Sequence, residues 1–310
     1  MDERIPLLID TDPGVDDALA LLMAFADRRH RLLGLTIAAG NVGLRHTVAN
    51  ALKLCEAAGV DVPVYAGCPV PLVHAAEDAA YVHGQDGFGD TGYAPATRQA
   101  EAEHAALAIV RLAREYAGEL LLVTLGPLTN LALALRLDPG LPGRVRRLVV
   151  MGGAATGRGN TSVSAEFNIA FDPEAADVVF RSFPSFDLVD WEAVLRHGFA
   201  HRQFEEWLGR GGELAAFYGR ISELTRRWSE DGRGHKWHSA DALAMAVALQ
   251  PDGLTQVEHR YLAVELEGRL SRGATVVDWL QRSGKAANAR LAIAYDQARF
   301  EAQLRAALGA

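Results

Sequence analysis

The sequence predicts an α/β protein whose open, mostly parallel sheet carries helices on both faces. Short apolar runs alternate with longer helix-like segments through residues 5–190, and this order is typical of parallel strands joined by crossover helices. The apolar runs are unbroken, as expected of strands buried on both faces. The second half of the chain is richer in helical segments. No Pro/Gly/Ser-rich linker divides the chain, so we expect a single domain over residues 1–310.

Each element is predicted from its local pattern. Apolar runs bounded by turn residues predict strands at 5–10, 32–38, 62–67, 119–125, 145–151, 185–190, 261–268 and 290–295. Helical periodicity predicts helices at 17–26, 45–58, 101–117, 127–136, 172–180, 201–209, 213–230, 240–249 and from Gln297 onward. The segments 67–98 and 152–171 are expected to be long loops, which in compact domains are usually functional or mobile.

Composition narrows the class of protein and its partners. Of 310 residues, 49% are hydrophobic and 23% are charged, with a net charge of −8, as in ordinary globular proteins. The absence of a basic tract argues against nucleic acid or an anionic membrane as partner. Cys55 and Cys68 match no disulfide or metal pattern. With no signal peptide and no apolar run of roughly 18 residues, we expect a cytoplasmic protein.

The most informative segment is the acidic turn LLIDTDPGVDDALALL. Asp10 and Asp12 flank one residue at the end of the first strand, so their side chains point the same way. Asp16 and Asp17 fall in the first turn of the following helix, where the helix dipole favours carboxylates. These four carboxylates repel one another unless a cation lies between them. All-oxygen ligation suits calcium or magnesium, although each acid alone is also typical of a strand end or helix start.

Polar groups also follow the other strands. Asn41 comes just after the second strand, and Leu125 ends the strand at 119–125, where its backbone carbonyl can be a ligand. The glycine-rich segment after the next strand supplies four further candidates: Met151, Asn160, Glu166 and Asn168. Asparagine and glutamate so placed can bind vicinal hydroxyls by donor and acceptor pairs. Each asparagine alone is typical of a turn, but together they favour a sugar site.

Two further segments have alternative interpretations. The loop HGQDGFGD carries His83 and Asp86 and is either a lid or a capped polar loop. Asp241 starts the helix at 240–249, where it is either an N-terminal helix acid or a distant carboxylate that completes the cation's ligand set.

Together these segments resemble the inosine-uridine-preferring nucleoside hydrolase family. The motifs that carry the resemblance occur in family order over residues 5–250, and the later GATVVDW also fits: DTDPGVDDALAL, AAGN, HGQDGFGD, LGPLTNLALAL, MGGA, AEFNIAFDPEAA and ADALAMA. The resemblance implies a Rossmann-like open sheet, calcium, and hydrolysis of the N-glycosidic bond of ribonucleosides. It also implies a homodimer or homotetramer.

The resemblance further implies a role for each motif residue. The calcium ligands are Asp12, Asp17, Asp241 and the carbonyl of Leu125, with Asp10 as a close supporting acid. The substrate-binding residues are Asp16, Asn41, His83, Met151, Asn160, Glu166, Phe167 and Asn168. Asp12 is also the general base, which takes a proton from water that the ion orients. The reaction passes through an oxocarbenium-like state, which nearby carboxylates stabilise.

One departure from the family concerns the leaving base. Many members carry a histidine directly before the last calcium-binding aspartate, as general acid, but this chain has Ala240 there. His238 is the candidate acid, provided that the helix has already begun at that residue, whereas His235 is expected on the surface. The alternative is aromatic stacking with the base, for which Trp228 and Trp237 are candidates.

Two other functions fit parts of the sequence. An aspartate after a first strand also begins phosphohydrolase chemistry with an aspartyl-phosphate intermediate. That chemistry requires a lysine near the phosphate, and Lys53, Lys236 and Lys285 do not fall at strand ends. The third hypothesis is a nucleoside-binding protein without catalysis, which the missing histidine keeps open.

Overall fold

Seven of the eight predicted strands align in one main sheet of the computed structural model, which describes residues 3–234 and 236–310. Among these residues the main sheet has eight strands in the order β3-β2-β1-β4-β5-β6-β12-β9. All neighbouring pairs are parallel except β12 with β9. Its strands are β1 (Ile5–Thr11), β2 (His30–Ile37), β3 (Val64–Ala66), β4 (Leu120–Thr124), β5 (Val145–Met151), β6 (Phe186–Val189), β9 (Leu254–Arg260) and β12 (Ala289–Tyr295).

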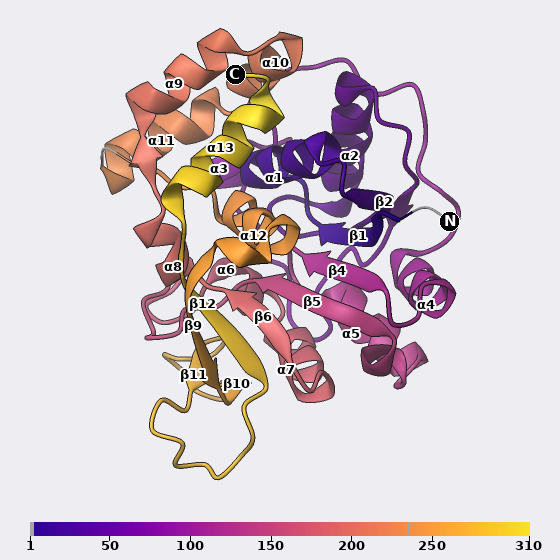
Figure 1. Cartoon of the computed structure of the whole chain (residues 1–310), viewed down its shortest axis with the longest axis vertical. Helices are drawn as coiled ribbons and strands as arrows, with labels where there is room; N and C mark the ends of the chain where they lie inside the picture. The colour runs from indigo at the N-terminus through magenta and orange to yellow at the C-terminus, as the bar shows by residue number, and fades with distance from the viewer. Residues whose placement is uncertain (1–2, 235) are drawn as a thin grey trace.

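Helices cover both faces of the sheet, as the sequence predicts (Figure 1). The helices of the first 200 residues are α1 (Val15–Ala26), α2 (Leu44–Ala58), α3 (Ala80–His83), α4 (Ala105–Glu115), α5 (Thr129–Leu137), α6 (Phe167–Phe171), α7 (Pro173–Ser182) and α8 (Trp191–Arg196). The later helices are α9 (His201–Arg210), α10 (Glu213–Ile221), α11 (Glu223–Arg233), α12 (Ala240–Leu249) and α13 (Gln297–Leu308).

Alternation along the strands divides the core in two. Leu7 and Ile9 of β1 pack with α1, α12 and α13 on one face, whereas Leu8 between them packs with α4, α5 and α7 on the other. Successive side chains of a strand point to opposite faces, so an unbroken apolar run supplies both cores. Each fully buried leucine contributes about 2 kcal/mol through removal of its apolar surface from water.

Two predictions about the elements need correction, and one strand of the main sheet was missed. The helix expected at 213–230 is two helices, α10 and α11, which meet at Ser222. The apolar run 261–268 contributes only β10 (Leu262–Val264), which pairs with β11 (Thr275–Val277) outside the main sheet. The edge strand β9 was not predicted, because its sequence LTQVEHR is largely polar.

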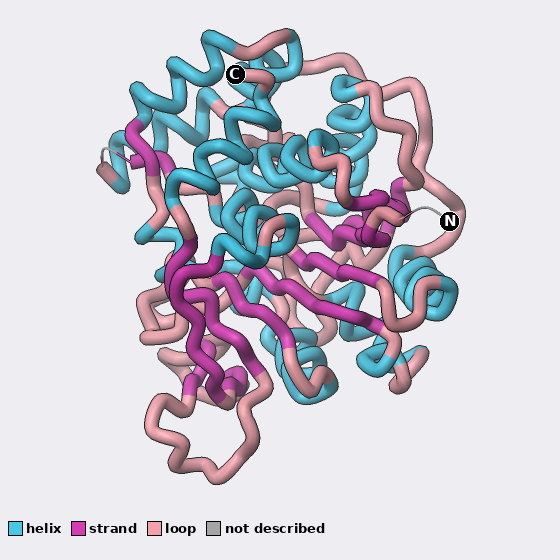
Figure 2. Tube along the Cα trace, viewed as in Figure 1, coloured by secondary structure: helices cyan, strands magenta, loops and turns pink. Residues whose placement is uncertain are grey.

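The remaining strands and the long loops lie outside the main sheet. β7 (Phe199–Ala200) and β8 (Lys236–Trp237) form a short antiparallel pair. The loop between β11 and β12 projects from the lower end of the molecule (Figure 2). The expected loops 67–98 and 152–171 contain α3 and α6, respectively.

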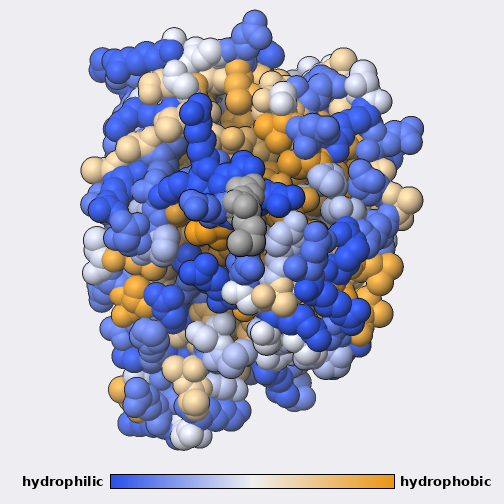
Figure 3. Space-filling view, turned by 45° about the vertical axis from the view of Figure 1, so that its right-hand side comes forward, coloured by the Kyte–Doolittle hydropathy of each residue, from blue (hydrophilic) through white to orange (hydrophobic). Residues whose placement is uncertain are grey.

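One face of the molecule and the lengths of its helices bear on contact with a membrane. The face in Figure 3 is mainly hydrophilic, with apolar residues in small groups. Among the residues that the structure describes, no helix has both the length and the apolar character needed to cross a bilayer.

Candidate active site

Polar groups from consecutive strands of the sheet meet at its carboxyl edge. β2, β1, β4 and β5 are neighbours in the sheet, so the residues at their ends come together: Asn41, Asp10, Leu125 and Met151. Ligands of open α/β sheets bind at this edge. Helix α12 places Asp241 in its first turn beside the same edge. The sheet and helix α12 therefore bring together residues that lie between Asp10 and Asp241 in the chain.

Three carboxylates form a tight acidic cluster at this edge, within the part of the chain that the structure describes. Asp16, Asp17 and Asp241 each place one oxygen within 4.8 Å of the other two. Asp17 and Asp241 are buried, whereas Asp16 is partly exposed. Burial, together with the charges of Asp16 and Asp17, raises the pKa of Asp241 well above its usual value. Such a cluster of unneutralised acids is costly unless a cation or protons balance its charge.

Asp17 is fixed by hydrogen bonds from the turn that precedes its helix. Its Oδ1 accepts hydrogen bonds from the Thr11 hydroxyl and, at 3.2 Å, from the backbone N–H of Asp12. Its Oδ2 accepts from the N–H of Gly14 at 3.0 Å and from Asn41 Nδ2 at 2.8 Å. The acid therefore caps its own helix and has a defined direction before any ligand binds.

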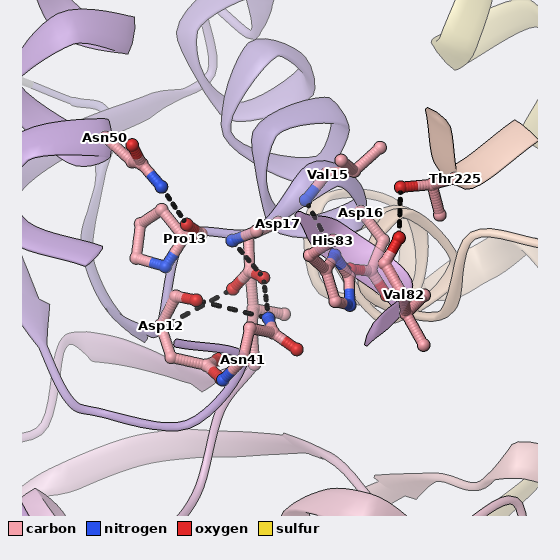
Figure 4. Close-up of polar contacts among 12 residues, drawn as sticks. Asp12, Pro13, Val15, Asp16, Asp17, Asn41, Asn50, Val82, His83 and Thr225 are labelled. Carbon is pink, nitrogen blue, oxygen red and sulfur yellow. Dashed lines mark hydrogen bonds and ion pairs between the residues drawn. The ribbon is translucent and has the colours of Figure 1, made fainter. Parts of the chain in front are cut away.

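Asp12 lies beside this cluster in a narrow space between two glycines. Its Oδ2 accepts a hydrogen bond from the N–H of Asn41 at 2.7 Å (Figure 4). A Cβ atom added at Gly40 would lie 2.1 Å from Asp12 Oδ2, and one added at Gly126 would lie 2.2 Å from Oδ1. Burial, and then the charge of Asp17, raises the pKa of Asp12 well above its usual value. The carboxylate is thus oriented by the backbone, and its negative charge is favoured only when a cation balances it.

Asp10 lies on β1, two residues before Asp12, and is fully buried. Its Oδ1 accepts hydrogen bonds from Thr36 Oγ1 at 2.6 Å and from Asn130 Nδ2 at 2.9 Å. Its Oδ2 has no hydrogen-bond partner among the described residues. Burial raises the pKa of Asp10 to about 7. Asn130, in the motif LGPLTN, is a supporting residue that sequence reasoning missed.

His83 reaches the acidic turn from helix α3. Its Nδ1 accepts a hydrogen bond from the N–H of Val15, at the start of α1, over 3.1 Å (Figure 4). Because Nδ1 is the acceptor, its lone pair is occupied and the proton of the neutral ring is assigned to Nε2. His83 lines the pocket, so in this tautomer it can donate a hydrogen bond there but does not serve as a base through Nδ1.

Several residues of the segment 160–168 also line the pocket. Asn160 Oδ1 accepts from the N–H of Phe167 at 2.9 Å, and Glu166 caps α6 by accepting from the N–H groups of Asn168 and Ile169 at 3.0 and 3.2 Å. Burial raises the pKa of Glu166 to about 7. Asn168 Nδ2 donates to the carbonyl of Leu125 at 2.6 Å. The carbonyl assigned to calcium from the sequence therefore already accepts one hydrogen bond and keeps its second lone pair.

Most of these groups border a pocket that opens to solvent, whereas Asp10, Asp12 and Asp17 are not among the described residues that line it. Aromatic side chains from the helical second half also line it, including Trp228 and Trp237. The ring of Tyr81 meets that of Trp228 edge-on, with 6.3 Å between centroids. Sequence reasoning missed Tyr81 and Trp191, which also line the pocket. Trp191 had a usable signal, because it directly follows the strand predicted at 185–190.

The position of His238 corrects one condition set by the sequence. Helix α12 begins at Ala240, so His238 precedes the helix and does not lie one helical turn from Asp241. Its ring packs against the backbone of Gly198, where an added Cβ would lie 2.4 Å from Nε2. His238 still lines the pocket. His235 lies outside the described residues.

The HGQDGFGD loop is anchored by its own hydrogen bonds and by a neighbouring helix. Asp86 Oδ1 accepts from the N–H groups of Phe88 and Asp90 at 2.7 and 3.0 Å, and Phe88 is fully buried. Asn50 Nδ2 donates both to the carbonyl of Asp86 at 2.8 Å and to that of Pro13 at 2.9 Å. The loop is therefore tied to the acidic turn, as a capped loop and not as a free lid.

Comparison with known proteins agrees with this geometry. The family profile described as inosine-uridine preferring nucleoside hydrolase matches residues 7–302. The pyrimidine-specific ribonucleoside hydrolase RihB of Escherichia coli O9:H4 is 36% identical over 299 residues, which cover 95% of this chain and 94% of that protein.

Solved structures of similar proteins extend over the whole fold. An inosine-guanosine nucleoside hydrolase superposes with a TM-score of 0.92 at 31% identity, covering 99% of both chains. A purine-preferring ribonucleoside hydrolase from Gardnerella vaginalis gives a TM-score of 0.90 at 30% identity, covering 98% of both chains.

Proposed function

We propose that this chain, which belongs to the inosine-uridine preferring nucleoside hydrolase family, hydrolyses ribonucleosides with calcium as cofactor and Asp12 as general base. Membership makes the chain an enzyme that hydrolyses ribonucleosides. The choice of calcium, the roles of individual residues and the mechanism are our proposals. The observation that carries them is the acidic cluster of Asp16, Asp17 and Asp241 beside Asp12.

The donor set fits a hard divalent cation. The clustered atoms are all carboxylate oxygens, and the pKa of both Asp12 and Asp241 is raised well above its usual value by burial and by neighbouring acids. Ca²⁺ takes six to eight oxygen ligands, including bidentate carboxylates and backbone carbonyls. We assign Asp12, Asp17, Asp241 and the carbonyl of Leu125 as its ligands. Asp10, two residues before Asp12, is assigned as a nearby supporting acid.

The residues around the cluster have complementary tasks. Bound calcium supplies a positive charge that lowers the pKa of water and orients hydroxyl groups. Asp12, held by the N–H of Asn41, takes the proton of the attacking water. Asp16, Asn160, Glu166 and Asn168 bind the ribose hydroxyls, and the carboxylates among them stabilise the positive charge that develops on the sugar. His83, Met151 and Phe167 complete the wall.

Aromatic rings and one histidine are the candidates for contact with the leaving base. Ala240 replaces the histidine that many members have at this position, so we assign Trp228 and Trp237 to base contact and keep His238 as the candidate proton donor. The named preferences of the relatives differ, since one is pyrimidine-specific and another purine-preferring. The proposal therefore covers purine and pyrimidine ribonucleosides alike.

The phosphohydrolase hypothesis finds no support in the lysines of the described chain. Lys53 pairs with Glu56 at 2.9 Å, Lys285 bonds the Tyr261 hydroxyl at 2.9 Å, and Lys236 lies on β8. None of these lysines borders the pocket among the residues that the structure describes.

We also propose a single catalytic domain over residues 1–310. The family profile spans nearly the whole chain, and β12 from the C-terminal end pairs directly with β6. We further propose a cytoplasmic location, on the basis of the cysteine content and composition of the sequence, and assembly as a homodimer or homotetramer, on the basis of the sequence resemblance.

The decisive experiment assays free ribose from inosine, adenosine, guanosine, uridine and cytidine, with and without a chelator. We expect hydrolysis of at least one nucleoside, loss of activity with chelator, and recovery with added calcium. Activity that persists after exhaustive chelation contradicts the metal assignment. Tight binding of a nucleoside without turnover over hours would favour the non-catalytic alternative, and phosphate release from p-nitrophenyl phosphate would favour the phosphohydrolase.

A further inference from the structure

The segment Asp190-Trp191-Glu192 has a feature that the reaction does not explain. It follows β6 at the same carboxyl edge of the sheet and begins α8. Trp191 lines the pocket, but the two flanking acids are buried away from the acidic cluster: Asp190 is 4% exposed and Glu192 is 7% exposed. Buried carboxylates need hydrogen-bond donors, and the partners of these two show what the segment does.

Both acids bind the loop that leaves β5. Asp190 caps α8 through Oδ1, which accepts from the N–H of Ala193 at 2.8 Å, and its Oδ2 accepts from the N–H of Ala155 at 2.7 Å. Glu192 Oε1 accepts from the N–H of Thr156 at 2.8 Å and, more weakly, from that of Arg158 at 3.3 Å. Its Oε2 accepts from the Thr156 hydroxyl at 2.7 Å.

A second set of contacts holds the same loop from the opposite side. Thr275 Oγ1, on β11, is 2.9 Å from both the N–H and the carbonyl of Ala154. Trp279 Nε1 donates to the carbonyl of Ala155 at 3.3 Å. The backbone of residues 154–156 is therefore held between α8 and the segment that contains β11.

After residues 154–156 the chain continues to the segment 160–168, which lines the pocket. Residues 161–163 are exposed. Asn160 is held downstream through its N–H to Ala165 and its Oδ1 to Phe167, at 3.2 and 2.9 Å, and the preceding Gly159 donates to the carbonyl of Val163 at 3.2 Å. Upstream, the last side chain that fixes the backbone before Asn160 is Glu192, through the N–H of Arg158. The chain leading to Asn160 is thus fixed by Glu192 at Arg158, while Asn160 itself is bonded to Ala165 and to the start of α6.

We infer that Glu192 is a positioning residue that sets the substrate-binding geometry of Asn160 through the loop at 154–158. The inference rests on the proposed function, because Asn160 is assigned there to the ribose. We call the hydrogen bonds from Glu192 to Thr156 and Arg158 the clamp. Loss of the clamp weakens binding of the substrate and of the transition state alike. Its signature is therefore a higher KM with little change in kcat. The calcium ligands come from other elements, so calcium affinity is unchanged.

The test compares three variants with the wild type. Glu192→Ala removes all the acceptors. Glu192→Gln keeps one oxygen for the backbone N–H groups and offers an amide N–H to the Thr156 hydroxyl, which can rotate to accept it. Glu213→Ala is the matched control, because Glu213 also lies in the first turn of a helix but is exposed.

Three measurements are made on each protein: kcat and KM at saturating calcium, calcium affinity by calorimetry, and amide exchange over residues 154–163. For Glu192→Ala we expect KM to rise roughly tenfold or more, as for loss of a hydrogen bond to a charged group, with faster exchange and unchanged calcium affinity. Glu192→Gln and Glu213→Ala should resemble the wild type.

The outcomes separate this inference from the proposed function. If the wild type hydrolyses no ribonucleoside, the proposed function is wrong. Amide exchange still tests the clamp in that case, and faster exchange in Glu192→Ala, but not in the other two variants, supports the clamp. Unchanged exchange in Glu192→Ala overturns the clamp whatever the activity. A KM equal to that of the active wild type, or parallel losses of kcat and calcium affinity, overturns the role of Glu192 in substrate positioning.

Discussion

The narrow space around Asp12 makes Gly40→Ala a sensitive test of the proposed general base. An added Cβ would lie 2.1 Å from Asp12 Oδ2 and 2.8 Å from the Cδ of Pro127. Ordinary contact between carbon and oxygen needs about 3.2 Å or more, so the carboxylate must move by roughly 1 Å, and this movement breaks its alignment with the N–H of Asn41. Misplacement of a reacting group by about 1 Å costs on the order of 100-fold in rate. That factor corresponds to about 2.7 kcal/mol in the activation free energy.

The assay measures kcat/KM for inosine and uridine at saturating calcium, together with circular dichroism and thermal melting. Gly43→Ala is the control, because Gly43 lies in the same connection between β2 and α2 and an added Cβ there meets no atom within 4 Å. We expect Gly40→Ala to remain folded but to lose about 100-fold in kcat/KM, whereas Gly43→Ala stays near the wild type. If folded Gly40→Ala retains activity within threefold of Gly43→Ala, the reaction does not depend on the position of Asp12, and the assignment of the base is wrong.

Three further predictions concern the same pocket. Asp12→Ala should lose calcium binding in calorimetry and nearly all hydrolysis, and unchanged turnover would refute its role. His238→Ala should change hydrolysis of purine nucleosides little, and a large loss confined to substrates with poor leaving bases would identify His238 as the acid. In chelator, the thermal stability should fall as pH rises from about 4 to about 7. Burial raises the pKa of Asp10 from 3.8 to about 7 and that of Glu166 from 4.5 to about 7, so the folded state holds more protons than the unfolded state and their stabilising contribution is lost as they ionise. Calcium should flatten this pH dependence, and melting curves that are independent of pH in chelator would contradict it.

Several parts of the fold and site follow from local sequence. The short, unbroken apolar run IPLLID predicts a doubly buried strand at 5–10, and β1 is observed at Ile5–Thr11. Helix α1 starts at Val15, directly after the Pro-Gly turn, so Asp16 and Asp17 fall in its first turn. The acidic turn is predictable because every residue in it is within a few positions of the others.

Other elements escaped prediction because their stability comes from distant partners. The polar strand β9 exists because β12 offers it a free edge, and the short helix α6 forms where Glu166 caps it and Asn168 bonds the carbonyl of Leu125. Neither carries a periodic apolar pattern strong enough to be recognised alone.

The sequence by itself determined the class of fold, the family resemblance and the acids of the first turn, since these depend on residues close together in the chain. Only the tertiary structure brought Asp241 within 4.8 Å of Asp16 and Asp17, set the tautomer of His83 through the N–H of Val15, and placed His238 before its helix. The physical reason is that these features are contacts between elements, and the order of strands in the sheet decides which elements meet.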